Sequence, residues 1–261
     1  MLKQRVITAL ISLVLLLVVL FALPPLSAKG MIALVVLAGA WEWSAFLESG
    51  SRAIRVVYVA LIGVLMAAVN LVWHDGLQVV LLVALAWWLA ALVWAFRFPT
   101  PIPAALRWIC GALVLVPLYA ALIALYEMSP WLLLFALLIV WSADVGAFFA
   151  GRQFGKVKLA PKISPGKTWE GVIGGLSLVA VLAAIITFQV DAAPAVLVPF
   201  CVAVAFTSII GDLTVSMFKR TSGLKDSGTL FPGHGGVLDR IDSVSAAAPL
   251  FALGLPWLGL V

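Results

Sequence analysis

Nine runs of apolar residues, separated by short segments with charges, proline or glycine, dominate the sequence. A helix of about 20 residues crosses the hydrocarbon core of a bilayer, which is about 30 Å thick. The runs approach or reach that length, and they cover residues 6–23, 31–47, 56–73, 77–96, 108–125, 131–149, 171–190, 195–210 and 244–260. Apolar runs of this length are read as membrane spans. The sequence therefore predicts an all-α, polytopic integral membrane protein with about nine transmembrane helices.

Composition leaves little chain for a separate soluble domain. Hydrophobic residues make up 65% of the sequence and charged residues 10%, whereas soluble domains have roughly 45–50% and about 25%. We divide the chain into 1–125, with the first five spans, and 126–261, with the last four spans and two loops, 150–170 and 211–243, where any catalytic residues are expected. We expect the two parts to form one structural unit.

The basic residues indicate the orientation in the membrane. With the N-terminus in the cytosol, 15 of the 16 lysines and arginines fall in cytosolic segments, and only Lys29 falls outside. This division follows the positive-inside rule and places the C-terminus outside. The two long loops then lie at the cytosolic face. Attraction of basic loops to anionic lipid headgroups is an alternative explanation for their charge.

Two acidic residues lie inside predicted spans. Asp144 is seven residues before Gly151, or about 10 Å inside the span end at about 1.5 Å per residue. An ionisable group at that depth marks a functional site or a structural ion pair, because burying it alone costs several kcal/mol. Glu42 lies at similar depth, and the two explanations are equal for it. An ion-coupled transporter could also use such acids, but the charged groups of this chain gather at one face.

The loop 150–170 contains a candidate phosphate-binding segment. A turn is predicted at 164–166, followed by Lys167, Thr168 and a helix with Glu170 in its first turn. Backbone N–H groups at a helix start bind anions, so Ser164, Lys167 and Thr168 are candidate ligand-binding residues. A basic loop with an ordinary helix cap is the alternative.

The loop 211–243 holds the densest group of charges. Asp212, Ser216 and Lys219 have the i, i+4, i+7 spacing that puts them on one helix face, and Asp239 and Asp242 have i, i+3 spacing. A glycine-rich stretch between them lets backbone approach a ligand closely and form anion-binding N–H concavities. Carboxylates alternating with cations are suited to a Mg²⁺–nucleotide site. The candidate glycines are Gly233, Gly235 and Gly236, and the cations are Lys219, Arg220, Lys225 and Arg240.

Two segments resemble a known family. Residues 216–242 read S-x-x-K-R-x-x-x-x-K-D-x-x-x-x-x-P-G-H-G-G-x-x-D-R-x-D, which resembles the signature of phosphatidate cytidylyltransferases. Residues 164–171 are similar to a second block of that family, S-P-K-K-T-x-E-G, with Gly166 in place of the first lysine, and residues 142–144 also resemble it. The N-terminal half matches only in being apolar and multi-span. The resemblance implies that CTP and phosphatidic acid give CDP-diacylglycerol and pyrophosphate with Mg²⁺, in a bacterial inner membrane with the active site in the cytosol.

Roles follow from the charges of this reaction. The lipid phosphate is already an anion, so the obstacle is repulsion from the triphosphate, which metal ions and cationic side chains relieve. We predict Lys167 on the leaving pyrophosphate, and the other cations on CTP or the lipid phosphate. The predicted ligands of Mg²⁺, or of Mg²⁺ and a second cation, are Asp212, Asp239 and Asp242. Residues predicted to lie in or beside the site without an assigned role are Ser216, Asp144, Asp226 and His234.

The expected partners are CTP, phosphatidic acid from the inner leaflet and membrane lipids, with no nucleic acid. A CTP-dependent polyprenol kinase is the nearest alternative enzyme, and its product would carry a phosphate without cytidine. Gly171 and Gly175 form a G-x-x-x-G pattern that permits close helix packing. That packing is either within one chain or between the chains of a homodimer.

Overall fold

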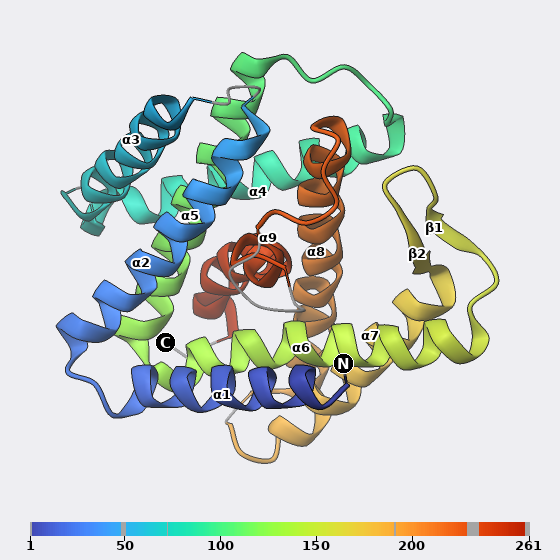
Figure 1. The fold of residues 1–261 in the computed structure, drawn as a ribbon. Coiled ribbons are helices and arrows are strands. Elements are labelled where there is room, and N and C mark those ends of the chain that lie inside the picture. The colour runs from blue at the N-terminus through green and yellow to red at the C-terminus, as the bar shows by residue number, and fades with distance from the viewer. Residues whose placement is uncertain (1, 48–50, 72, 191, 229–234, 259–261) are drawn as a thin grey trace.

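The computed structural model describes residues 2–47, 51–71, 73–190, 192–228 and 235–258, and of residues 2–9 and 73–75 only the backbone. Helices account for most of these residues (Figure 1). They are α1 Leu2–Phe21, α2 Pro25–Trp43, α3 Arg52–Leu71, α4 Trp73–Arg97, α5 Ala104–Met128, α6 Pro130–Phe154, α7 Trp169–Ile186, α8 Pro194–Thr221 and α9 Leu238–Gly254, with 3-10 turns at Ser44–Phe46 and Leu255–Leu258. In the described part of the chain, eight helices are long and apolar enough to cross a membrane, and α1 contains a shorter apolar stretch, Leu10–Phe21. The all-α membrane fold is confirmed, and the count of nine is approximate.

The helices near the predicted site are longer than the apolar runs. Helix α6 ends at Phe154, α8 ends at Thr221, and α9 begins at Leu238. The predicted loops 150–170 and 211–243 are therefore too long, and the segments between the helices are 155–168 and 222–237. Hydropathy marks the part of a helix that contacts lipid, whereas the backbone hydrogen bonds continue into polar sequence. Asp144 accordingly lies about 15 Å from the end of its helix.

A two-stranded antiparallel sheet follows α6, which the prediction missed. Strand β1 (Lys158–Ala160) pairs with β2 (Ser164–Thr168). The predicted turn at 164–166 is wrong, because those residues lie in β2 and the turn is at 161–163. The Trp169 backbone N–H donates to Val157 O at 2.9 Å and closes the open end of the hairpin. Ile163 is buried, which packs the turn against the helices.

Helix α9 occupies the middle of the bundle (Figure 1). It contacts α2, α4, α5, α6 and α8, and α5 and α9 are the most buried of the eight long apolar helices. Phe251 on α9 is fully buried between Phe135 on α6 and Phe200 on α8, with ring centroids 5.6 and 5.7 Å away. The predicted division at 125/126 falls inside α5, and helices from both parts pack around α9.

Small residues bring α6 and α7 into close contact. A Cβ at Gly171 would lie 3.0 Å from the carbonyl oxygen of Ala147, and a Cβ at Gly175 would lie 2.5 Å from that of Ala143. The distance at Gly175 is too short for any Cβ, and the distance at Gly171 is tighter than most Cβ contacts, so small residues permit this approach. The G-x-x-x-G pattern therefore packs two helices of the same chain, and a homodimer stays a prediction.

Candidate active site

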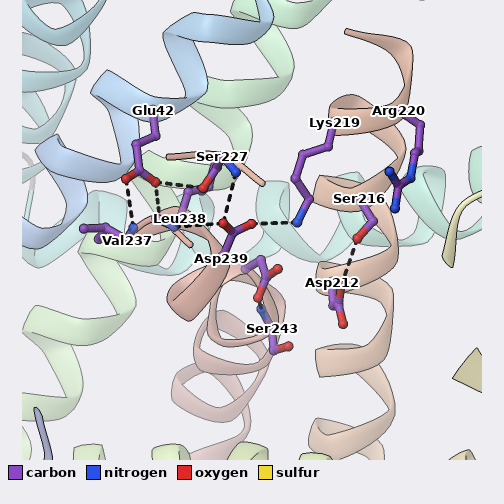
Figure 2. A network of polar contacts seen from close by, with 12 residues as sticks. Glu42, Asp212, Ser216, Lys219, Arg220, Ser227, Val237, Leu238, Asp239 and Ser243 are labelled. Carbon is purple, nitrogen blue, oxygen red and sulfur yellow. Dashed lines mark hydrogen bonds and ion pairs between the residues drawn. The ribbon is translucent and has the colours of Figure 1, made fainter. Parts of the chain in front are cut away.

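One face of α8 carries three of the predicted site residues (Figure 2). The Ser216 hydroxyl donates a hydrogen bond to Asp212 Oδ1 at 3.1 Å. Lys219, one turn further along, is buried at the end of the same row. The predicted i, i+4, i+7 alignment on one helix is present, but these residues lie inside α8 and not in a loop.

Strand β2 brings Lys167 to this face. Its ammonium group forms an ion pair with Asp212 Oδ2 at 2.5 Å, and the side chains are 27% and 25% exposed, respectively. The next residue, Thr168, is buried, and its hydroxyl accepts a hydrogen bond from the Gly171 N–H at 3.2 Å, which caps α7. The hairpin thus presents Lys167 to α8 while Thr168 anchors it to α7. Ser164 lies at the start of β2, away from that ion pair in the strand.

Asp239, in the first turn of α9, uses both carboxylate oxygens (Figure 2). Oδ1 accepts a hydrogen bond from Lys219 Nζ at 2.7 Å, and both side chains of this pair are 10% exposed. Oδ2 accepts hydrogen bonds from the backbone N–H groups of Ser227, at 3.0 Å, and Gly236, at 2.9 Å. Asp239 therefore joins α8, the segment before α9 and α9 itself.

Asp242 and Asp144 lie in the neighbourhood of Asp212. Asp242 is buried, accepts a hydrogen bond from the Ser243 N–H at 2.8 Å, and interacts electrostatically with Asp212. Asp144 on α6 also interacts electrostatically with Asp212 and with Lys167. Lys167 pairs with Asp212 and interacts electrostatically with Asp144 and Asp242, so carboxylates from three helices lie around one lysine.

A metal ion has to be considered at this cluster. Within the described ranges, no group of three or more His, Cys, Asp or Glu side chains has the spacing of a ready-made metal site. Of the predicted trio Asp212, Asp239 and Asp242, Asp239 accepts hydrogen bonds from Lys219 and two backbone N–H groups, and the trio as Mg²⁺ ligands stays a prediction. Mg²⁺ usually takes only one or two carboxylates and completes its shell with water and substrate phosphate. Asp212 and Asp242 fit that requirement.

A cavity of about 360 Å³ opens beside the Lys167–Asp212 pair. It lies between α6, α7 and β2, with Ile209 of α8 at its wall. Its polar lining comes from Asp144, Arg152, Lys167 and Thr168, and its apolar lining includes Phe148, Val172 and Leu176. A cavity with both charged and apolar lining residues suits an amphipathic ligand.

Comparison with known sequences identifies the family of this chain. The sequence model described as "Cytidylyltransferase family" matches residues 3–257. The chain belongs to the cytidylyltransferase family. It is 45% identical over 262 residues to the phosphatidate cytidylyltransferase of Pseudomonas aeruginosa, covering 97% of this chain and 96% of the relative. It is 39% identical over 284 residues to the phosphatidate cytidylyltransferase of Haemophilus influenzae, covering 97% and 98%. Each of these matches covers nearly the whole chain.

Other predicted residues of this cytidylyltransferase lie at the edge of the site. Arg220 Nε donates a hydrogen bond to Ile163 O at 3.2 Å, which ties α8 to the hairpin turn. Arg240 is exposed on α9 and interacts electrostatically with Asp144. Lys225 and Asp226 are exposed, and within the described ranges no hydrogen bond joins either to the Asp212 or Asp239 contacts. These two residues are available to ligands from the solvent side.

The glycine-rich stretch is described only in part. Gly233 and His234 lie outside the described residues. Gly235 has a φ of +78°, a left-handed conformation that favours glycine. A Cβ there would also lie 2.5 Å from Asp239 Oδ2, and the neighbouring Gly236 donates to that oxygen. The candidate phosphate-binding N–H of Gly236 is therefore directed at Asp239.

The sequence prediction missed Ser227 and left Glu42 undecided. Glu42 lies on α2 and accepts hydrogen bonds from the Ser227 hydroxyl and from the backbone N–H groups of Val237 and Leu238. Its position near the cytosolic end of a predicted span was the available signal. Nothing in the sequence distinguished Ser227, because the partner of its hydroxyl, Glu42, is 185 residues away.

Proposed function

We propose that this cytidylyltransferase transfers the cytidylyl group of CTP to phosphatidic acid, forming CDP-diacylglycerol and releasing pyrophosphate. The observation that carries the proposal is the cluster of Asp144, Asp212, Asp242 and Lys167 beside a cavity that has both charged and apolar lining residues. Relatives matched over nearly their whole length are named for this activity.

The reaction needs charge compensation more than proton transfer. An oxygen of the lipid phosphomonoester attacks the α-phosphorus of CTP, the bond from that phosphorus to the oxygen bridging to the β-phosphorus breaks, and pyrophosphate leaves with the bonding electrons. Both reactants are anions, so cations fixed near the reacting atoms lower the barrier. Lys167 and Lys219 supply them from β2 and α8. Arg220, Lys225 and Arg240, at the rim, attract the triphosphate.

Lys167 exchanges partners in this proposal. Lys167 and Asp212 are each about one quarter exposed, so a substrate phosphate can compete with Asp212 for the ammonium group. Asp212, beside Asp242, then presents carboxylate oxygens to a cation. Mg²⁺ held by Asp212 and Asp242 would neutralise phosphate charge when bound. Ser216 orients Asp212 through its hydrogen bond.

The cavity is the proposed approach of phosphatidic acid from the inner leaflet. Arg152 would attract the lipid phosphate, and Phe148 and Leu176 would contact its acyl chains, while Lys167 stays assigned to the leaving pyrophosphate. This direction places the phosphate next to Asp144 and the Lys167–Asp212 pair. It also requires the site to face the cytosol, with the N-terminus inside and the C-terminus outside a bacterial inner membrane, as the distribution of basic residues predicts.

Two labelled forms of CTP test this function. Detergent-solubilised protein would be incubated with phosphatidic acid and CTP labelled at the α-phosphate or at the γ-phosphate. We expect label in the lipid phase only from α-labelled CTP. Transfer of γ-label to a polyprenol would instead support the kinase. Absence of both transfers would leave an ion-coupled transporter, which ion-flux assays in proteoliposomes would detect.

A further inference from the structure

Glu42 is the only acidic side chain from the first five helices that contacts the segment around the proposed site, among the residues described. It lies at the end of α2 and is 8% exposed. Oε1 accepts from the Val237 N–H at 2.9 Å, and Oε2 accepts from the Leu238 N–H and the Ser227 hydroxyl, both at 2.8 Å (Figure 2). Its three partners are 185 or more residues away in sequence.

These contacts cap α9 from another helix. The N-cap residue of α9 is Val237, whose apolar side chain cannot accept a hydrogen bond. The first N–H groups of a helix have no partner inside it and attract negative charge. Glu42 provides that carboxylate, so the start of α9 is fixed relative to α2.

Ser227 links this cap to the ion pair of the site. Its hydroxyl binds Glu42, and its backbone N–H binds Asp239, whose other oxygen binds Lys219. On the far side of the glycine-rich stretch, Gly236 binds Asp239 while Val237 binds Glu42. Two carboxylates therefore hold both ends of that stretch together, and Lys219 is positioned by one of them.

The backbone passes close to Glu42 at two glycines, where a Cβ would displace the carboxylate. A Cβ added at Gly228 or at Gly236 would overlap the Glu42 carboxylate. Both glycines are thus explained by one side chain, which the backbone approaches from two directions.

The end of α2 is itself held firmly. Buried Arg107 donates to Phe46 O at 2.8 Å and to Ile102 O at 2.9 Å, and Trp43 Nε1 donates to Arg107 O at 2.9 Å. Trp43 also packs against Phe218 of α8, with ring centroids 4.8 Å apart. Glu42 therefore projects from a rigid base.

We propose that Glu42 is a positioning residue for cytidylyl transfer, acting through Ser227 and the start of α9 on Asp239 and Lys219. The inference rests on the proposed function, which places the reaction at this cluster. Glu42 contacts no residue assigned to Mg²⁺ or to the lipid phosphate, so its removal changes alignment and not the charge that meets the substrates. A displacement of about 1 Å at a reacting centre can lower the rate about 100-fold.

Glu42→Gln is the first test, because it preserves size while turning one acceptor oxygen into an NH₂ donor that faces an N–H or hydroxyl group. We expect kcat to fall by roughly 10- to 100-fold and KM for each substrate to change less than about threefold. Ser227→Ala, which removes one contact, should lower kcat by a smaller factor. The control is Lys29→Ala, which breaks the exposed Lys29–Glu127 pair linking α2 to α5 and should leave kcat unchanged.

A second test uses the clash at Gly236. Gly236→Ala should lower kcat in the wild-type background, but much less in a Glu42→Ala background, because the overlapping carboxylate is gone. Multiplicative effects of the two changes on kcat, measured per folded protein, would overturn the proposal. So would a Glu42→Gln variant with a lowered thermal midpoint and wild-type kcat.

The controls separate the possible failures. If the Glu42 variants do not fold, Ser227→Ala decides, and wild-type kcat in that variant would refute the positioning role. If wild-type protein forms no labelled liponucleotide in the same assay, the proposed function is refuted. Active wild-type protein with unaffected variants would refute only the inference about Glu42.

Discussion

Replacing Asp239 with asparagine would separate two roles for this carboxylate. The sequence suggested a Mg²⁺ ligand, whereas the structure places Oδ1 on Lys219 and Oδ2 on two backbone N–H groups. Asparagine keeps the shape but removes the charge and can place an NH₂ group against those donors. We expect a loss of stability without a change in Mg²⁺ dependence.

The expected magnitude follows from burial. Removing one partner of a buried ion pair costs about 3–5 kcal/mol, because the other charge is left without compensation. The Lys219 and Asp239 side chains are 10% exposed, so water relieves a little of this and we expect about 3 kcal/mol. For a protein of this size that corresponds to a fall in thermal midpoint of the order of 5–10 °C.

A double-mutant cycle would isolate the pair. Asp239→Asn, Lys219→Met and the double variant would be compared by thermal unfolding in detergent. The double variant should be more stable than the sum of the single losses predicts, by about 2 kcal/mol, since no uncompensated charge remains. Asp212→Asn is the matched control, because its pair with Lys167 is about one quarter exposed and should contribute about 1 kcal/mol or less.

Two results would refute this reasoning. Additive losses in the cycle would show that Lys219 and Asp239 are not coupled. A raised Mg²⁺ requirement for Asp239→Asn, measured by liponucleotide formation across Mg²⁺ concentrations, would return Asp239 to the metal site that the sequence predicted.

Three further predictions concern charge and topology. Lys167→Ala should lower turnover about 100-fold or more, with at most a small fall in thermal midpoint because its pair with Asp212 contributes about 1 kcal/mol or less. Turnover near wild type would leave this lysine only as a partner of Asp212. Asp242→Asn should raise the Mg²⁺ concentration needed for half-maximal residual activity, and an unchanged requirement would remove Asp242 from the metal ligands. A cysteine placed near Glu127 should react with an impermeant reagent added outside cells, whereas one near Lys162 should not; labelling at Lys162 would reverse the orientation.

Local sequence was enough for the helices and for one face of the site. Apolar runs predicted the spans because a bilayer accepts few other structures, and i, i+4 spacing placed Ser216 beside Asp212 because helix geometry is regular. Boundaries were less well predicted. Helices α6 and α8 continue through charged residues that hydropathy treats as loop. The hairpin at 158–168 depends on the burial of Ile163 and on the hydrogen bond from Trp169 to Val157, which local sequence does not specify.

What the sequence determined by itself was the membrane fold, the family resemblance and the set of charged residues, since periodicity, length and residue type are local properties. Tertiary structure decided the partners of those charges. The i, i+3 spacing of Asp239 and Asp242 is the same whether Asp239 binds Mg²⁺ or pairs with Lys219. Only the contacts with Lys219, Ser227 and Gly236 make Asp239 a link between helices. The sequence alone did not show whether Glu42 is functional or structural. The packing of α2 beside α9 decides this, because it brings the Glu42 carboxylate to the N–H groups of Val237 and Leu238. The physical reason is that the free energy of a buried charge depends on which groups surround it, and in a helical bundle those groups come from distant parts of the chain.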